Sequence, residues 1–195
     1  MHALSVFAFL AFLIYLAGMA ALHVLPTGQE PLYNTVSDYA RSAFGTTYRA
    51  LTALNALGVG ALAWAFATAG IRPAPAAAGI AALAVLALCR LGMVGVITDL
   101  SGTRVTASGS GHHLLAIASF VAAVCAATFL TGSLQRAADH PLLAVLAGLS
   151  FPLAVLQVVG LTPWFRRIFG LLERLFLLDV GLWLLAAAQA LLVWR

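Results

Sequence analysis

Apolar runs of roughly 20 residues, separated by short polar stretches, recur along the whole chain. A helix needs ~20 apolar residues to cross the hydrocarbon core of a bilayer, because each residue advances it by ~1.5 Å. The pattern predicts six transmembrane helices, at residues 1–25, 48–70, 76–96, 112–130, 142–161 and a last one that ends near residue 192. We therefore predict an all-α, polytopic membrane protein in which residues 1–195 form a single bundle.

The first apolar run is expected to remain in the protein as a membrane span. No basic segment precedes it, and it is much longer than the ~7–15 apolar residues of a signal peptide. The polar segment that follows, TGQEPLYNTVSDYARSAFGT, is too polar to enter lipid and too long for a tight turn. Ser37 or Asp38 is expected to cap a short helix within it.

The sequence TPWFRRIFGLLERLF precedes the last apolar run. Thr162 followed by Pro163 is typical of a helix start, because a threonine side chain caps free amides and proline has no amide to leave unbonded. Arg167 and Arg174 would share one face of this helix. We expect it to lie partly in the membrane interface and to continue into the last span.

Composition narrows the class of partner. The mean hydropathy is +1.04, and the net charge of +4 comes from arginines spread singly or in pairs along the chain. Nucleic acid is excluded as a partner, since binding it requires a concentrated basic surface. Cys89 and Cys125 lie inside apolar runs without metal-binding or redox spacing, so they are expected to be small buried side chains.

Six antiparallel spans place the first, third and fifth loops on the same side of the membrane, which we call the odd-loop face. Most polar groups of the chain fall there: His23, Asp38, Arg41, Arg49, Asp99, Arg104, His112, His113, Arg166, Arg167, Glu173 and Arg174. The opposite face has little beyond Arg72, Arg136, Asp139, His140 and Arg195. This asymmetry predicts a water-accessible polar pocket between the helix ends of the odd-loop face.

Two charged residues lie deeper in the membrane. Arg90 and Asp179 are each roughly 12–16 Å from the odd-loop face at ~1.5 Å per residue. Either charge alone would cost ~2.5–3.5 kcal/mol to insert near the centre of a span. We therefore predict that Arg90 and Asp179 form a structural ion pair.

Several short motifs resemble a known family. They are VSDYA in the first loop, ITD and TASGSGHHLLAIASF across the third loop, and GLLERLFLLDVGLW at the start of the last span. In this order they resemble the bacterial six-helix membrane family catalogued as domain of unknown function 998. The resemblance implies a multi-pass protein of a cell membrane, the inner membrane of a bacterium, but it supplies no reaction.

The resemblance also implies which positions form the site. The family's Ser-Asp falls on Ser37 and Asp38, its Phe-Pro-Thr-Asp on residues 96–99, its Gly-x-x-His on Gly109 and His112, and its Gly-Leu-x-Gln-Arg on residues 170–174, followed by Trp183. This chain departs from the family at Ile97, where proline is usual, and at Glu173, where glutamine is usual. His113 is not a family position.

The first functional hypothesis is a pocket that binds a lipid headgroup or a small anionic or polar ligand, in a binding or transport role. Arg174 would bind the anionic group, and His112 would donate or accept a proton. Arg167, Arg41, Ser37 and Glu173 would complete the ligand-binding set. Membrane lipids are expected partners in either role.

The alternative is a metal-dependent intramembrane hydrolase that acts on a lipid ester or amide. His112, Asp99 and Asp38 would hold a divalent ion such as zinc or act as acid and base, with His23 or His113 as a further ligand. Neither HExxH nor GxSxG is present to signal standard hydrolase chemistry. A third hypothesis is that these polar groups only cap helices, which would leave a purely structural bundle.

Overall fold

The protein is described by a computed structural model that covers residues 1–70, 74–100, 103–137 and 140–193. Throughout these residues the ordered elements are helices, and no strand is present. The elements are α1 (His2–Val24), η1 (Val36–Arg41), α2 (Gly45–Thr68), α3 (Ala74–Gly95), α4 (Ala107–Ala137), α5 (Pro141–Gly160), η2 (Arg166–Ile168) and α6 (Phe169–Leu192). Within the described ranges, six helices are long and apolar enough to cross a membrane. The all-α, six-span prediction is confirmed, and the chain is a multi-pass membrane protein.

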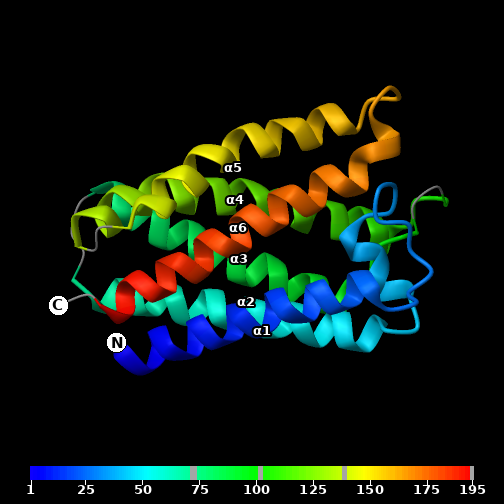
Figure 1. Ribbon diagram of the computed structural model, residues 1–195. Helices are drawn as coiled ribbons and strands as arrows, with labels where there is room; N and C mark the ends of the chain where they lie inside the picture. Colours follow the sequence, from blue (N-terminus) through cyan, green and yellow to red (C-terminus); the bar gives the residue numbers. More distant parts are fainter. Residues whose placement is uncertain (71–73, 101–102, 138–139, 194–195) are drawn as a thin grey trace.

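The helices run up and down side by side (Figure 1). Each packs on the next in sequence, and α6 also packs on α1 and α4, which closes the bundle. The first, third and fifth loops lie at one end, while both termini lie at the other (Figure 1). On the opposite face, Arg72, Asp139 and Arg195 lie outside the described residues.

Helix α4 begins earlier than the hydropathy pattern predicts, at Ala107 instead of residue 112. Thr106 caps it, since its hydroxyl accepts a hydrogen bond from the amide of Gly109 at 3.1 Å. Asp99 accepts a hydrogen bond from the Thr106 amide at 2.6 Å. The capped start draws the polar sequence ASGSG into the helix, so His112 lies in the second turn.

The predicted helix start at Thr162 and Pro163 is wrong. Thr162 instead donates its hydroxyl hydrogen backward, to the carbonyl oxygen of Val159 at 2.7 Å, and so helps to end α5. A turn and the short η2 follow, and α6 begins only at Phe169. Across residues 161–168, all of which the structure describes, the chain turns from α5 into α6, and η2 is the helix present there in place of the longer interfacial helix that was predicted.

In the first loop the cap of η1 is Thr35, and not Ser37 or Asp38 as predicted. Asp38 lies at the third position of η1, where its carboxylate accepts a hydrogen bond from the Thr35 amide at 3.0 Å. The acidic side chain thus fixes the helix start from inside the first turn.

The core between the helices is rich in alanine, with larger side chains from every helix filling the spaces between them. Among them, Trp183 donates its indole hydrogen to the hydroxyl of Thr131 at 2.9 Å, which joins α6 to α4. Phe120 of α4 and Phe176 of α6 meet edge to face, with ring centroids 5.0 Å apart. These contacts hold α4 and α6 together.

Candidate functional site

A cavity of about 890 Å³ opens beneath the odd-loop face, between α3, α4, α5 and α6. Near the odd-loop face, at the helix ends and loops, its lining includes Ser37, Arg90, Asp99, His112, Gln157 and Glu173, and we call this part the polar end. Most of the wall that α4 and α5 contribute is apolar and includes Ile117, Phe120, Val121, Phe151, Ala154 and Val158. The same cavity is therefore lined by charged and amide side chains in one part and by hydrocarbon side chains in another.

The apolar part of the cavity reaches the outer surface of the bundle. Val121 on α4 is 59% exposed, while Phe151 and Val158 on α5 are 66% and 67% exposed. Both helices cross the membrane, so these surfaces face lipid. The cavity is thus open sideways to the bilayer between α4 and α5.

The predicted ion pair between Arg90 and Asp179 is wrong. Among the described residues, the one ion pair within 4.0 Å joins Arg41 to Asp99. Arg90 contacts the hydroxyl of Tyr15 at 3.5 Å, and both carboxylate oxygens of Asp179 lack a hydrogen-bond partner in the described part of the chain. Helix α3 packs mainly on α2 and α4, so equal depth in the membrane did not make these two residues neighbours.

The acidic residue close to Arg90 is Glu173. Both side chains are only 7% exposed and both line the polar end of the cavity. They lie close enough for their charges to interact. One carboxylate oxygen of Glu173 also accepts a hydrogen bond from the amide of Val36 at 2.7 Å, which ties the first loop to α6.

His112 is held in one tautomer. Its Nδ1 lies 2.7 Å from the carbonyl oxygen of Val96, and a carbonyl oxygen only accepts, so Nδ1 carries the hydrogen. In the neutral ring Nε2 then has a free lone pair. The residue is 3% exposed and lines the cavity, so it contributes a hydrogen-bond acceptor there.

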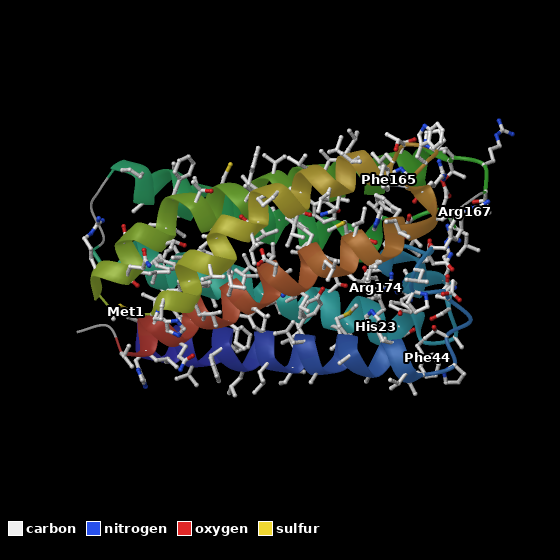
Figure 2. All side chains as sticks on the ribbon, turned by 45° about the horizontal axis from the view of Figure 1, so that its top comes forward. Met1, His23, Phe44, Phe165, Arg167 and Arg174 are labelled. Atoms are coloured by element: carbon white, nitrogen blue, oxygen red, sulfur yellow. The ribbon has the colours of Figure 1, made fainter. Side chains whose placement is uncertain are left out.

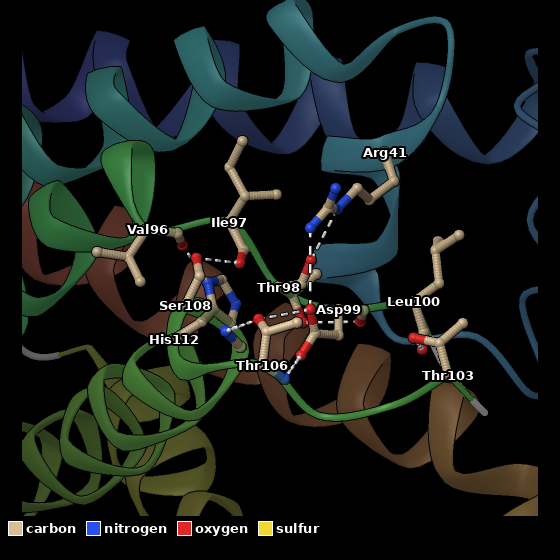
Figure 3. A network of polar contacts seen from close by, with 11 residues as sticks. Arg41, Val96, Ile97, Thr98, Asp99, Leu100, Thr103, Thr106, Ser108 and His112 are labelled. Atoms are coloured by element: carbon tan, nitrogen blue, oxygen red, sulfur yellow. Dashed lines mark hydrogen bonds and ion pairs between the residues drawn. The ribbon is translucent and has the colours of Figure 1, made fainter.

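Asp99 organises the third loop, as Figure 3 shows. One carboxylate oxygen accepts from the Thr106 amide at 2.6 Å and the other from the Thr106 hydroxyl at 2.9 Å. A Cβ at Gly109 would overlap this carboxylate, so glycine is required there. Arg41 donates from Nε to the carbonyl oxygen of Thr98 at 2.8 Å and places Nη2 3.9 Å from Asp99. Asp99 therefore holds Thr106, the cap of α4, in place beside the cavity mouth.

These contacts give the stability of the third loop a pH dependence. The Thr106 amide, with help from the Thr106 hydroxyl and Arg41, lowers the pKa of the Asp99 carboxyl below its usual value. A lowered pKa in the folded state means that ionised Asp99 stabilises folding above the unfolded pKa of ~3.9, and that this stability is lost as pH falls through the folded pKa. We expect Asp99→Asn to melt at a lower temperature than the wild type at neutral pH, and the difference to vanish in strong acid.

Thermal unfolding in detergent over a pH series measures this difference. Glu30→Gln is the matched control, because the Glu30 side chain is exposed and it is the Glu30 main-chain amide that donates a hydrogen bond to Oδ1 of Asn34, at 2.8 Å. It should melt like the wild type at every pH. If Asp99→Asn lowered the melting temperature by the same amount at every pH, the stabilising role assigned to the Asp99 charge would be wrong.

Asp38 is fully buried behind the polar end of the cavity and does not line it. One of its carboxylate oxygens accepts hydrogen bonds from Asn34 Nδ2 at 3.2 Å and from the Thr35 amide at 3.0 Å. It lies close enough to His112 and Glu173 to interact with their charges. Asp38 therefore orders the first loop and influences the cavity from behind, while its neighbour Ser37 lines the wall.

Arg174 anchors the first loop to α6. Among the described residues its guanidinium donates five hydrogen bonds, of 2.7 to 3.2 Å, to Nε2 of His23, to the carbonyl oxygens of Pro31, Asn34 and Gly170, and to the hydroxyl of Tyr39. Figure 2 shows Arg174 and His23 near each other beneath this loop. Arg174 does not line the cavity, so the prediction that it binds an anionic ligand is not supported.

His23 and Arg167 also lie away from the cavity. Both ring nitrogens of His23 are used, Nδ1 by the carbonyl oxygen of Met19 at 2.6 Å and Nε2 by Arg174. Arg167 is exposed in η2, at the outer edge of the bundle (Figure 2). Its neighbour Arg166 lines the cavity instead.

The predicted metal ligands His112, Asp99 and Asp38 do not come together as a metal site. Within the part of the chain that the structure describes, no group of three or more His, Cys, Asp or Glu side chains is arranged to hold a metal ion. Asp99 faces Thr106 and Arg41, Asp38 faces the first loop, and only His112 presents a free nitrogen.

Sequence reasoning missed Gln157 as a site residue. It is 5% exposed on α5, lines the cavity, and neither side-chain polar atom has a hydrogen-bond partner among the described residues. An amide inside an apolar span was the available signal, since buried polar groups in membranes usually mark a site.

Comparison with known proteins gives one match. The family model described as "Protein of unknown function (DUF998)" matches residues 9–190. No curated protein and no solved structure matches the chain. Because the match covers nearly the whole sequence, including every helix that lines the cavity, the chain belongs to the DUF998 family.

Proposed function

We propose that the protein binds an amphiphilic membrane molecule in this cavity, with its polar group between Arg90, His112 and Glu173 and its hydrocarbon part along α4 and α5. The supporting observation is that the polar lining and the apolar lining belong to one cavity, which opens toward lipid. An amphiphile is the ligand class that matches both parts of the cavity. A purely apolar ligand would leave the polar side chains without hydrogen bonds, and a purely polar one would leave the apolar wall in contact with water.

Binding is better supported than lipid hydrolysis. A hydrolytic site needs a nucleophile or an activated water held by a base whose orientation is fixed by a further group. The two aspartates predicted for that role are Asp38 and Asp99. Their carboxylates accept hydrogen bonds from the main-chain amides of Thr35 in the first loop and Thr106 in the third. His112 remains as a hydrogen-bond acceptor, which serves a bound polar group directly.

The proposal is tested by filling the apolar part of the cavity. Ala154→Phe places a ring in the wall on α5, and it should reduce retained lipid by about tenfold, or about 1.4 kcal/mol. Native mass spectrometry after purification in a mild detergent measures the lipid that remains bound.

Ala144→Phe is the matched control, because Ala144 is exposed on the same helix and does not line the cavity. This variant should retain lipid as the wild type does. Equal lipid retention by both phenylalanine variants, with both still folded, would show that lipid binds elsewhere and would refute the proposal.

A further inference from the structure

The polar end of the cavity contains two opposite charges that are not paired directly. Arg90 and Glu173 are each 93% buried, being 7% exposed, and both line the cavity. Their charges interact, yet their nitrogen and oxygen atoms are more than 4.0 Å apart, since no such ion pair is present among the described residues. A ligand group in the cavity can therefore meet both.

Arg90 has unused hydrogen-bonding capacity. A guanidinium carries five N–H donors. In the described part of the chain, Nη1 makes one long contact of 3.5 Å with the hydroxyl of Tyr15, and the buried Nε has no partner. A planar cation in this state is suited to an oxygen anion, because carboxylate and phosphate oxygens match its geometry.

Glu173 supplies the complementary acceptor. Its Oε2 accepts one hydrogen bond from Val36, while an ionised carboxylate has about four acceptor sites. Arg174 and Asp38 also interact with the charge of Glu173, Arg174 by attraction and Asp38 by repulsion. Of these four charged residues, only Arg90 and Glu173 line the cavity, so these are the two that a ligand meets directly.

Gln157 adds a donor and an acceptor at the same end of the cavity, both without a partner among the described residues. An anion alone would leave Glu173 uncompensated and repelled, and a cation alone would do the same to Arg90. A ligand with both charges close together satisfies the two residues at once.

We infer that the cavity takes a zwitterionic head group, with its oxygen anion on Arg90 and its N–H-bearing cation on Glu173, as in a phosphoethanolamine group. This inference rests on the proposed function for the attached hydrocarbon chains. The free head group has the same chemistry as the lipid, so the two sources are separated by experiment.

The test is a competition between lipids in nanodiscs that contain equal amounts of phosphatidylethanolamine, phosphatidylcholine and phosphatidylglycerol. Native mass spectrometry of the full chain measures which lipid is retained. We expect about tenfold enrichment of phosphatidylethanolamine over the other two. Phosphatidylcholine has no N–H to donate to Glu173, and phosphatidylglycerol has no cation.

Two variants connect this preference to the residues. Glu173→Gln keeps an acceptor oxygen for Val36, so the first loop stays in place, but it should abolish the preference for phosphatidylethanolamine. Arg90→Gln should weaken retention of all three phospholipids, and Arg90→Lys should restore part of it. Arg167→Gln is the control for loss of an exposed charge and should change nothing.

Two results would overturn the inference: equal retention of the three lipids by the wild type, or an unchanged preference in Glu173→Gln. Soluble O-phosphoethanolamine provides a separate arm, in which binding is followed by calorimetry. If this compound binds in a Glu173-dependent way while no lipid is retained, the zwitterion inference stands and the proposed lipid-binding function fails.

Discussion

Replacement of Arg174 with methionine is expected to release the first loop from α6 and to lower the free energy of unfolding by about 3 kcal/mol or more. The guanidinium joins α1, the first loop and η1 to α6 through its hydrogen bonds to His23, Pro31 and Tyr39. Methionine has a similar length but donates no hydrogen. Thermal or denaturant unfolding in detergent measures the loss, and limited proteolysis at residues 25–44 detects the released loop.

Arg167→Met is the matched control, since Arg167 is exposed and lies two turns earlier in the chain. It should leave both the stability and the protease resistance of the first loop close to those of the wild type. If Arg174→Met were as stable and as protease-resistant as this control, the assignment of Arg174 as the loop anchor would be wrong.

Gly170→Ala is expected to displace the same loop by a different route. A Cβ at this position would lie 2.7 Å from the carbonyl oxygen of Pro31 and would also overlap the carbonyl oxygen of Asn34. Both obstacles are main chain, so the loop itself must move, at a cost of about 1–3 kcal/mol. The displacement should also weaken the contact of Glu173 with Val36. Unfolding and proteolysis again provide the measurement.

Gly148→Ala on α5 is the control, because a Cβ there meets nothing within 4 Å. We expect this variant to be as stable as the wild type or slightly more stable, since alanine favours a helix over glycine by up to about 1 kcal/mol. A Gly170→Ala protein that matched Gly148→Ala would show that the loop does not pack against α6 as described. Gly170→Ala combined with Arg174→Met should cost less than the sum of the two, since both act on one contact.

Hydropathy was sufficient to predict the six helices and the face where the polar residues gather. Both properties follow from local sequence, because a span requires a long apolar run and the alternation of spans assigns each loop to a side. Ser37, Asp99, His112 and Glu173 were predicted as site residues, and all line the cavity. For these positions, closeness to the odd-loop face was enough.

Pairing inside the membrane could not be predicted in this way. Sequence position gives the depth of a residue in a span, but the neighbour it faces depends on how each helix is rotated and which helices pack together. Arg90 and Asp179 have similar depths, yet α3 packs mainly on α2 and α4, and Arg90 lies near Tyr15 and Glu173 instead. For the same reason, the sequence did not indicate that Gln157 on α5 faces the cavity.

The role of Arg174 depended on the path of the first loop, which no local pattern specifies. An arginine at the start of a span is compatible with anion binding, but the carbonyl oxygens of Pro31 and Asn34 occupy its donors. The start of α4 was misplaced for a related reason. The carboxylate of Asp99, seven residues before Thr106, supplies the interaction that extends the helix.

The carboxylate of Glu173 has two sides, one bonded to the amide of Val36 and one facing the cavity. A molecule that binds this carboxylate from within the membrane therefore alters the hydrogen bond that connects Glu173 to η1 at the surface. Thermodynamic linkage makes the effect reciprocal, so a partner that fixed η1 from the aqueous side would change the affinity of the cavity by the same factor. Binding in the membrane interior and binding at the water-facing rim are thus coupled through the side chain of Glu173.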